Sequence, residues 1–168
     1  MNAVAHPRIA LRPLLPQDAP LVADIFRASI ETLTADDYDA AQQEAWMAAA
    51  DDASAFADRL GRQLTLVATL EGSAVGFISL ADNERIDMLY VHPAAAGRGV
   101  GAALLDAIEK LAAARGASRL TTDASDTAAD FFGKRGFIAQ QRNTVSVGGQ
   151  WLANTTMTKT LTPQGGRA

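Results

Sequence analysis

The chain has 168 residues, of which 48% are hydrophobic and 20% are charged. These values are typical of a globular domain, so we expect a single domain over residues 1–168 with loose termini at about 1–7 and 162–168. The net charge of −4 disfavours a nucleic-acid partner, because binding to a phosphate backbone needs an excess of Lys and Arg. Cysteine is absent, which excludes disulfides and cysteine nucleophiles.

Neither a membrane partner nor a metal site is expected. No apolar run approaches the roughly 20 residues of a membrane span. Residues 1–14 lack the apolar region of a signal peptide, so a cytoplasmic protein is expected. The two histidines, His6 and His92, lie far apart in sequence and have no ligand partners nearby, so no metal cofactor is predicted.

Hydrophobic periodicity predicts the order of the elements. Thr34 and Asp37 have the spacing of a capping box at the start of a second helix. Most neighbouring strands are joined by tight turns, which predicts an α/β fold with a mixed, mostly antiparallel sheet of six to seven strands flanked by helices. In chain order the pattern predicts a strand at 9–14, helices at 16–33, 34–50 and 53–60, strands at 64–70, 74–80 and 84–91, a helix at about 100–115, a strand at 119–124, a helix at 127–134, and strands at 137–147 and 151–161.

The segment 86–105 contains the strongest functional signal. A short apolar strand is followed by Pro93, by glycines at alternate positions 97, 99 and 101, and by a long apolar helix. Glycine tolerates positive φ angles and lets a ligand approach the backbone closely. A helix N-terminus adds free N–H groups and positive potential. This segment therefore predicts a site for the phosphate groups of a cofactor.

The residues alone leave more than one interpretation of this glycine loop. A Walker-type phosphate loop fails, because it needs Gly-Lys-Ser/Thr where the chain has Gly-Val-Gly-Ala. A dinucleotide-binding loop matches Gly97, Gly99 and Ala102, with Asp123 about 20 residues later. Against it, the first glycine does not follow the strand directly. A glycine-rich connection without any ligand is the third interpretation.

Two segments together resemble the GCN5-related N-acetyltransferase (GNAT) family. The acetyl-CoA loop of that family reads Arg/Gln-x-x-Gly-x-Gly/Ala, which residues 96–101 match except at Ala96. Residues 125–137 resemble its Asn-x-x-Ala-x-x-x-Tyr-x-x-x-Gly-Phe segment, with Ser125 replacing Asn and Phe132 replacing Tyr. The segments LYVHP, ADDYDAAQQEAW and FFGKRGF are most similar to the YafP-like branch of the family.

The resemblance implies an acyltransferase that moves an acetyl group directly from acetyl-CoA, its co-substrate, to a primary amine of a small molecule or protein. It also implies a splay between the fourth and fifth strands that accommodates the pantetheine arm, and it allows a homodimer. A non-catalytic acyl-CoA-binding sensor and a dinucleotide-binding oxidoreductase stay open as alternatives. The resemblance assigns these residues to the cofactor: Leu89, Tyr90, Val91, Gly97, Arg98, Gly99, Val100, Gly101, Ala102, Ser125, Phe132 and Lys134.

A carboxylate near the fourth strand is the expected base, because an amine at neutral pH must lose a proton before it attacks a thioester. Glu84 and Asp87 are the candidates. Asp87 is expected to share a strand face with Leu89 and Val91, because side chains alternate along a strand. A structural, hydrogen-bonded role for Asp87 is the alternative.

The acid that would protonate the departing thiolate is not evident. The family uses a tyrosine where this chain has Phe132, so Tyr38, Tyr90 or water is expected to take its place. The acceptor is expected to meet the helical region after the first strand, where carboxylates crowd around Tyr38 and Trp46. These carboxylates predict either a pocket for a cationic amine or a solvated helix face; they are Glu31, Asp36, Asp37 and Asp39.

Overall fold

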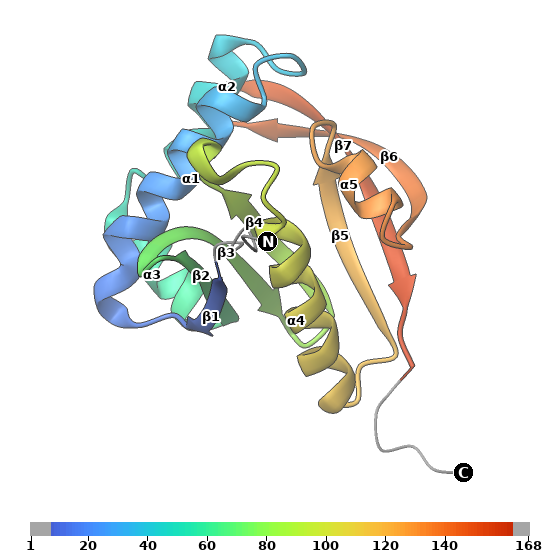
Figure 1. Cartoon of the computed structure of the whole chain (residues 1–168). Helices are drawn as coiled ribbons and strands as arrows, with labels where there is room; N and C mark the ends of the chain where they lie inside the picture. The colour runs from blue at the N-terminus through green and yellow to red at the C-terminus, as the bar shows by residue number, and fades with distance from the viewer. Residues whose placement is uncertain (1–7, 163–168) are drawn as a thin grey trace, which may run out of the picture.

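The computed structural model describes residues 8–162 and contains a seven-stranded sheet with helices on both faces (Figure 1). The strand order is β1-β2-β3-β4-β5-β7-β6, and among the described strands only β4 and β5 pair in parallel. The α/β fold and the mostly antiparallel sheet are thus confirmed. The strands are β1 (Ile9–Pro13), β2 (Leu64–Leu70), β3 (Ser73–Ala81), β4 (Arg85–Val91), β5 (Arg119–Ser125), β6 (Ile138–Val147) and β7 (Gln150–Thr160).

Five α-helices occur in residues 8–162, and short 3₁₀ turns accompany them. No helix in this part of the chain is long and apolar enough to cross a membrane. Apart from Thr162, the termini that we expected to be loose fall outside the described residues, as does His6. The helices are α1 (Ala19–Leu33), α2 (Ala40–Met47), α3 (Ala53–Gly61), α4 (Val100–Ala114) and α5 (Ala129–Gly133).

The start of α2 lies further along the chain than the sequence predicted. The hydroxyl of Thr34 donates to the carbonyl of Ile30, and so belongs to the end of α1. The side chain of Asp39 accepts from the Gln42 amide at 2.8 Å, and the Gln42 side chain accepts from the Asp39 amide at 2.9 Å. This reciprocal pair is the capping box, so the predicted box at Thr34 and Asp37 is wrong.

The two faces of the sheet carry separate apolar cores. Helix α4 covers one face, where Leu66 and Ile78 are buried. Helices α1 and α3 cover the other face, where Val67 and Phe77 are buried. Because side chains alternate along β2 and β3, one sheet supports both cores. Strands β2 and β3 are therefore covered by α4 on one face and by α1 and α3 on the other.

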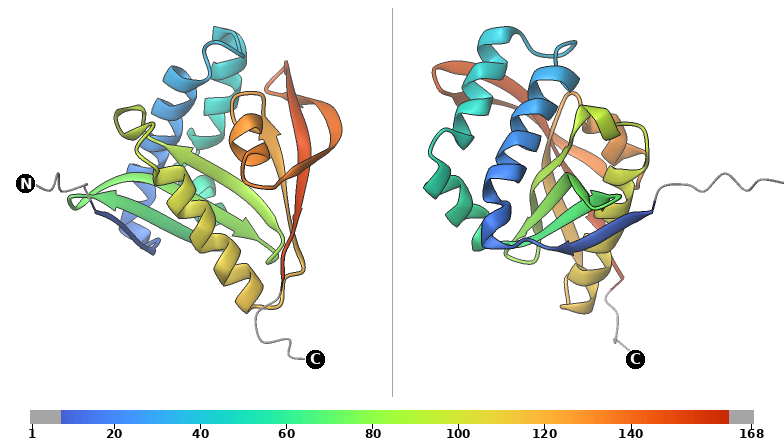
Figure 2. Two further views of the ribbon diagram at one scale, coloured as in Figure 1. Left: turned by 45° about the vertical axis from the view of Figure 1, so that its right-hand side comes forward. Right: turned by 60° about the vertical axis from the view of Figure 1, so that its left-hand side comes forward.

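Strands β4 and β5 are hydrogen-bonded over a short stretch only. Their pairing consists of Arg85 with Thr121 and Ile86 with Thr122. Beyond these two pairs the strands diverge, and we call this region the fork. Figure 2 shows the strands β1–β4 separating from β5–β7 toward the upper end of the molecule. The splay that the family resemblance implied is thus confirmed.

A β-bulge in β4 lies at the base of the fork. Leu80 of β3 pairs with Ile86, and Ser79 pairs with Met88, which leaves Asp87 as the extra residue. In a regular strand Ile86 and Met88 would share a face. Here Ile86 packs in the core under α4, whereas Met88 packs in the core under α1 and α3. The bulge therefore re-aims the side chains on either side of it.

Gly76 of β3 allows α4 to pack close to the sheet. A Cβ atom at this position would lie 2.9 Å from the Val100 side chain and 3.1 Å from the Tyr90 carbonyl oxygen. Such a separation from backbone cannot be relieved by a side-chain rotation alone. The beginning of α4, and the glycine loop before it, therefore depend on a residue without a side chain.

We expect Gly76→Ala to lower the free energy of unfolding by about 1–3 kcal/mol, because overpacking forces backbone and side chains apart. Gly61→Ala, near the end of α3, is the matched control, since nothing lies within 4 Å of a Cβ atom there. Urea denaturation measures both variants. Equal unfolding free energies for the two variants would contradict the close approach of α4.

Candidate active site

The fork encloses a cavity of about 300 Å³. Its walls come from β4, β5, β6 and β7, with contributions from the α1–α3 side and from α5. Three charged residues line it: Arg59, Asp87 and Asp123. The rest of the lining is mainly apolar and aromatic. The cavity therefore combines a large apolar surface with a few charged groups, as small-molecule sites do.

The glycine loop, residues 97–101, precedes α4 at the mouth of the fork. Gly97 has φ +76° and Gly99 has φ +84°, values that non-glycine residues rarely adopt. A Cβ atom at either position would meet nothing within 4 Å, so the space beside the loop is open. The expectation that these glycines permit positive φ is confirmed at Gly97 and Gly99.

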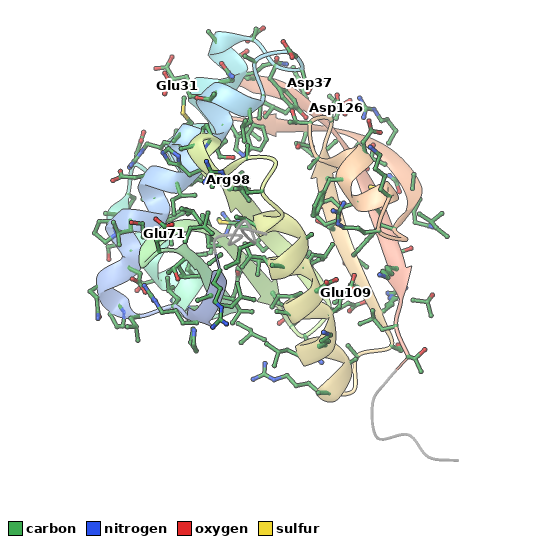
Figure 3. The ribbon with its side chains drawn as sticks, in the orientation of Figure 1. Glu31, Asp37, Glu71, Arg98, Glu109 and Asp126 are labelled. Carbon is green, nitrogen blue, oxygen red and sulfur yellow. The ribbon has the colours of Figure 1, made fainter. Side chains whose placement is uncertain are left out.

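Six consecutive amides in this loop have no hydrogen-bond partner among the described residues. The Ala96 amide bonds to Pro93, and the next amide with a partner is that of Ala103, which bonds to Gly99. The N–H groups of residues 97–102 lie between them and are free. Free N–H groups at a helix N-terminus carry partial positive charge and form an anion site. Arg98 lies on the same loop and is exposed (Figure 3).

The third loop glycine has a different physical role. Gly101 is helical, and a Cβ atom there would lie 3.3 Å from the ring of Phe131 in α5. The guanidinium of Arg135 stacks over the same ring, 4.0 Å from its centroid. Gly101 thus lets α5 pack on α4 and brings a cation near the loop. Lys134 does not line the fork cavity and instead lines a separate shallow depression beside α5.

The edge of β4 that faces the fork has unpaired backbone groups. The His92 amide bonds to the carbonyl of Val75, so in this antiparallel ladder Tyr90 also directs its backbone groups toward β3. Leu89 and Val91 therefore direct theirs toward β5, which has already diverged. An extended chain containing amides could pair with this edge as an added strand does.

Asp87 is held by donors on several sides. Arg59 donates to both carboxylate oxygens at 2.8 and 2.9 Å, Gln63 donates at 2.9 Å, and Arg85 donates at 2.6 Å. Burial alone would raise the pKa of Asp87, but these hydrogen bonds outweigh burial and lower the pKa from 3.8 to about 2. A carboxylate so strongly stabilised in its ionised form is a poor proton acceptor.

The predicted strand face of Asp87 is wrong, because the bulge moves this residue out of the alternation. Its partners Arg59 and Gln63 come from α3 and the turn after it, on the side of the sheet where Met88 and Tyr90 also pack. Leu89 packs on the opposite side, under α4. Of the two roles considered, the geometry favours the structural, hydrogen-bonded one.

Glu84, the other candidate base, lies apart from the cavity. Its carboxylate accepts from Arg119 at 2.7 Å, and its carbonyl accepts from the Thr121 amide at 2.9 Å. Both contacts join the turn before β4 to the beginning of β5, next to the two residue pairs that connect these strands. Glu84 thus does not line the cavity.

The hydroxyl of Tyr38 is used twice. It accepts from the Asp126 amide at 2.9 Å and donates to the Ala153 carbonyl at 2.6 Å. Burial raises the pKa of Tyr38, so the hydroxyl stays protonated. Tyr38 therefore connects the turn after α1 to the end of β5 and to β7, and its one proton already has an acceptor.

The hydroxyl of Tyr90, unlike that of Tyr38, accepts a hydrogen bond but donates none to a described residue. Trp46 Nε1, which can only donate, contacts the Tyr90 oxygen at 3.1 Å. The hydroxyl proton of Tyr90 therefore has no acceptor among the described residues and is free for a molecule in the cavity. Burial strongly raises the pKa of Tyr90, so it can donate a hydrogen bond but is a very weak acid.

The carboxylates around α1 and α2 do not line the cavity. Glu31, Asp36, Asp37 and Asp39 are exposed, and Figure 3 shows Glu31 directed away from the sheet. Asp37 accepts from Thr127 and Asp39 caps α2. Of the two roles considered for this acidic run, the solvated helix face is therefore the one found. Tyr38 and Trp46 do line the cavity.

Phe132 and Ser125, which the resemblance assigns to the cofactor, lie beside the fork. Both line the cavity, and the Ser125 hydroxyl accepts from the Ala128 amide at 3.1 Å. The Phe132 ring packs edge-on against Phe131 and Phe137. No group of three or more His, Cys, Asp or Glu side chains in residues 8–162 could hold a metal ion.

Three residues at or near the site were missed by sequence reasoning. Arg59 and Asp123 line the cavity, and Arg135 stacks beside the glycine loop. Arg59 belongs to a short helix with no motif. Asp123 was noted only for the dinucleotide alternative, which the antiparallel sheet contradicts. The position of Asp123 in a strand of alternating polarity was the one sequence feature that could have pointed to it as a site residue.

Comparison with known proteins connects this geometry to one group of enzymes. Residues 34–161 match the family model of the acetyltransferase (GNAT) domain. The uncharacterized N-acetyltransferase YafP of Escherichia coli is 34% identical over 146 residues, which cover 87% of this chain and 92% of YafP. A GCN5-related N-acetyltransferase from Rhodopseudomonas palustris is 63% identical, with a TM-score of 0.90 over 96% of this chain and 99% of that structure.

A more distant structure shares the fold. The PaiA N-acetyltransferase of Thermoplasma acidophilum, solved in complex with coenzyme A, is 21% identical and has a TM-score of 0.75. The similarity covers 91% of this chain and 99% of the PaiA chain. The fold is thus shared by two chains that differ in most of their residues.

The Asp87 cluster makes stability depend on pH. Because the folded-state pKa of Asp87 is lowered to about 2, its contribution is present above about pH 4 and is lost as the pH falls toward 2. Between about pH 5 and pH 2 the wild type should lose roughly 2 kcal/mol more unfolding free energy than Asp87→Asn. Urea denaturation across this range measures the difference. Parallel curves for the two proteins would show that the cluster does not stabilise the carboxylate.

The Tyr38 hydroxyl is expected to matter for folding stability. Tyr38→Phe leaves the Asp126 amide and the Ala153 carbonyl without their partner, so the unfolding free energy should fall by about 1–3 kcal/mol. Tyr90→Phe, which removes a hydroxyl whose proton has no described acceptor, is the comparison and should cost less. Thermal and urea denaturation test both variants. A larger loss in Tyr90→Phe would contradict the hydrogen-bond assignment.

Proposed function

The chain belongs to the GNAT acetyltransferase family, and from this we propose that it transfers an acetyl group from acetyl-CoA directly to a primary amine held in the fork cavity. The observation that carries the proposal is the row of six free amides, residues 97–102, at the mouth of the fork. An anionic cofactor fits there because each N–H group lacks a partner and the helix dipole is aligned with them.

The pyrophosphate of the cofactor would bind to the amides of Gly97, Gly99 and their neighbours up to Ala102. The side chain of Arg98 would add a positive charge on the solvent side, and Arg135 is placed to contribute a second one. The two positive-φ glycines are needed because a side chain on either would strain the loop and occupy the open space beside it. Lys134 is not part of this proposal, since it faces a different depression.

The pantetheine arm would run along the fork edge of β4. The backbone groups of Leu89 and Val91 that point toward β5 are in place to pair with its two amides, as an edge strand pairs with a peptide. The thioester end would then reach the cavity between Phe132 and the β4 wall. PaiA is a fold relative solved with coenzyme A, which agrees with a cofactor of this kind.

The leaving thiolate would depart without a side-chain acid. Phe132 cannot donate a proton, and the proton of Tyr38 is held by the Ala153 carbonyl. Tyr90 has a free proton, but its raised pKa makes it a much weaker acid than a thiol, whose ordinary pKa is about 8.5. A thiolate of that basicity is a fair leaving group near neutral pH, so water is sufficient as the final proton source.

Asp87 would serve to shape the fork, and Glu84 to close its base.

A non-catalytic acyl-CoA sensor is the alternative that Ala96 and Phe132 favour, since both replace side chains that family enzymes use. A cytoplasmic location and a homodimer stay predictions. Release of coenzyme A in the presence of acetyl-CoA and a panel of primary amines separates the enzyme from the sensor. Binding of acetyl-CoA without any release would favour the sensor.

Gly99→Ala should weaken coenzyme A binding by at least about tenfold, because the alanine strains the loop and displaces amides that contact the pyrophosphate. Gly116→Ala is the matched control. Gly116 also has positive φ, +87°, at the other end of α4, and nothing lies within 4 Å of a Cβ atom there. Titration calorimetry with coenzyme A measures both variants. Equal weakening in the two would attribute the effect to helix strain and would contradict the phosphate site.

A further inference from the structure

Asp123 is the second of the two carboxylates that line the fork cavity. Its neighbours on β5, Leu120 and Ala124, are buried under α4. By alternation Asp123 projects from the opposite face of β5, the face that does not carry α4. The residue is exposed, and no cation lies within ion-pair distance of it in residues 8–162.

A chain of hydrogen bonds orients the Asp123 carboxylate. The Asn143 side-chain NH₂ donates to the Thr156 hydroxyl at 2.8 Å, which obliges that hydroxyl to direct its own proton elsewhere. The Thr156 hydroxyl donates to Asp123 Oδ1 at 2.6 Å. Oδ2 receives no hydrogen bond from a described residue. One carboxylate oxygen is therefore fixed while the other is available to a ligand.

The two carboxylates of the cavity differ in how far their negative charge is compensated by neighbouring donors. Asp87 receives donors from two arginines and a glutamine, and its negative charge is fully compensated. Asp123 receives one neutral hydroxyl donor. An ammonium group that enters the cavity would therefore be attracted to Asp123 and not to Asp87, where Arg59 would repel it.

We propose that Asp123 binds the ammonium group of the acceptor and accepts its proton, and that the acceptor is an amine with one positive charge on an apolar or aromatic body. This inference rests on the proposed transferase function. In the step, a proton passes from nitrogen to Asp123 Oδ2, and the nitrogen lone pair forms a bond to the thioester carbonyl carbon. The carbon–sulfur bond breaks, and its electron pair leaves with the sulfur as a thiolate. The nitrogen then loses its second proton to water, which leaves a neutral amide.

The acceptor class follows from the remainder of the lining. Tyr38, Trp46 and Leu152 line the cavity together with other apolar side chains, so the body of the acceptor meets apolar surface. The rings of Trp46 and Tyr90 can add cation–π attraction. A second positive charge would have no free carboxylate to pair with and would face Arg59. Polyamines should therefore be poorer acceptors than monoamines.

The test uses the full-length protein, acetyl-CoA, and phenethylamine as the monoamine probe, with spermidine as the polyamine probe. Asp123→Asn should lower kcat/KM for phenethylamine by about 100-fold or more, the scale of a lost general base. Its Kd for acetyl-CoA should stay within about twofold of the wild-type value. Thr156→Val, which removes only the orienting donor, should lower kcat by a smaller factor.

Asp82→Asn is the matched control, because it removes one exposed carboxylate at a turn where φ is +54° and asparagine is well tolerated. It should leave kcat/KM unchanged. A loss of less than about threefold in Asp123→Asn overturns the inference, and so does a loss of acetyl-CoA binding in that variant. Preference for spermidine overturns the acceptor class. Wild-type protein that binds acetyl-CoA but releases no coenzyme A with any amine contradicts the proposed function instead.

Discussion

The rest of the structure depends on the early end of hydrogen bonding between β4 and β5. Only two residue pairs join these strands, after which the sheet opens into the fork. The opening leaves the Leu89 and Val91 backbone groups unpaired, creates a cavity in what would otherwise be a continuous sheet, and places the N-terminus of α4 at its mouth. Unpaired backbone groups of this kind would destabilise the fold if they were buried without a partner. Together they suit a long cofactor that supplies the missing partners.

The bulge at Asp87 and its cluster of donors lie at the base of the fork. A buried carboxylate stabilises a fold only when its hydrogen-bonding capacity is met, and Arg59, Arg85 and Gln63 meet it here. The cluster connects α3 to β4 at the residue where the two parts of the sheet begin to diverge. A carboxylate whose pKa is lowered in this way is a poor base. The base that we propose instead is Asp123, on β5.

Local features of the fold could be predicted from the sequence, because they depend on residues close together in the chain. Strand and helix periodicity predicted the mostly antiparallel sheet, and the positive φ of Gly97 and Gly99 follows from the loop they belong to. The side of Asp87 could not be predicted, since a bulge depends on the register with β3 and not on β4 alone. Asp123 was missed for a similar reason, because Thr156 and Asn143, which orient it, lie on other strands. Tyr38 bonds to Ala153, far along the chain, and no spacing rule connects the two.

The central claim is that free backbone groups at the fork hold the cofactor. Amide hydrogen exchange, measured residue by residue by NMR with and without coenzyme A, tests it most directly. In the free protein the amides of residues 97–102 have no acceptor among the described residues and should exchange fast. Coenzyme A should slow exchange at these amides and at one or both of Leu89 and Val91. Protection confined to other parts of the sheet, with residues 97–102 still exchanging fast, would contradict the account.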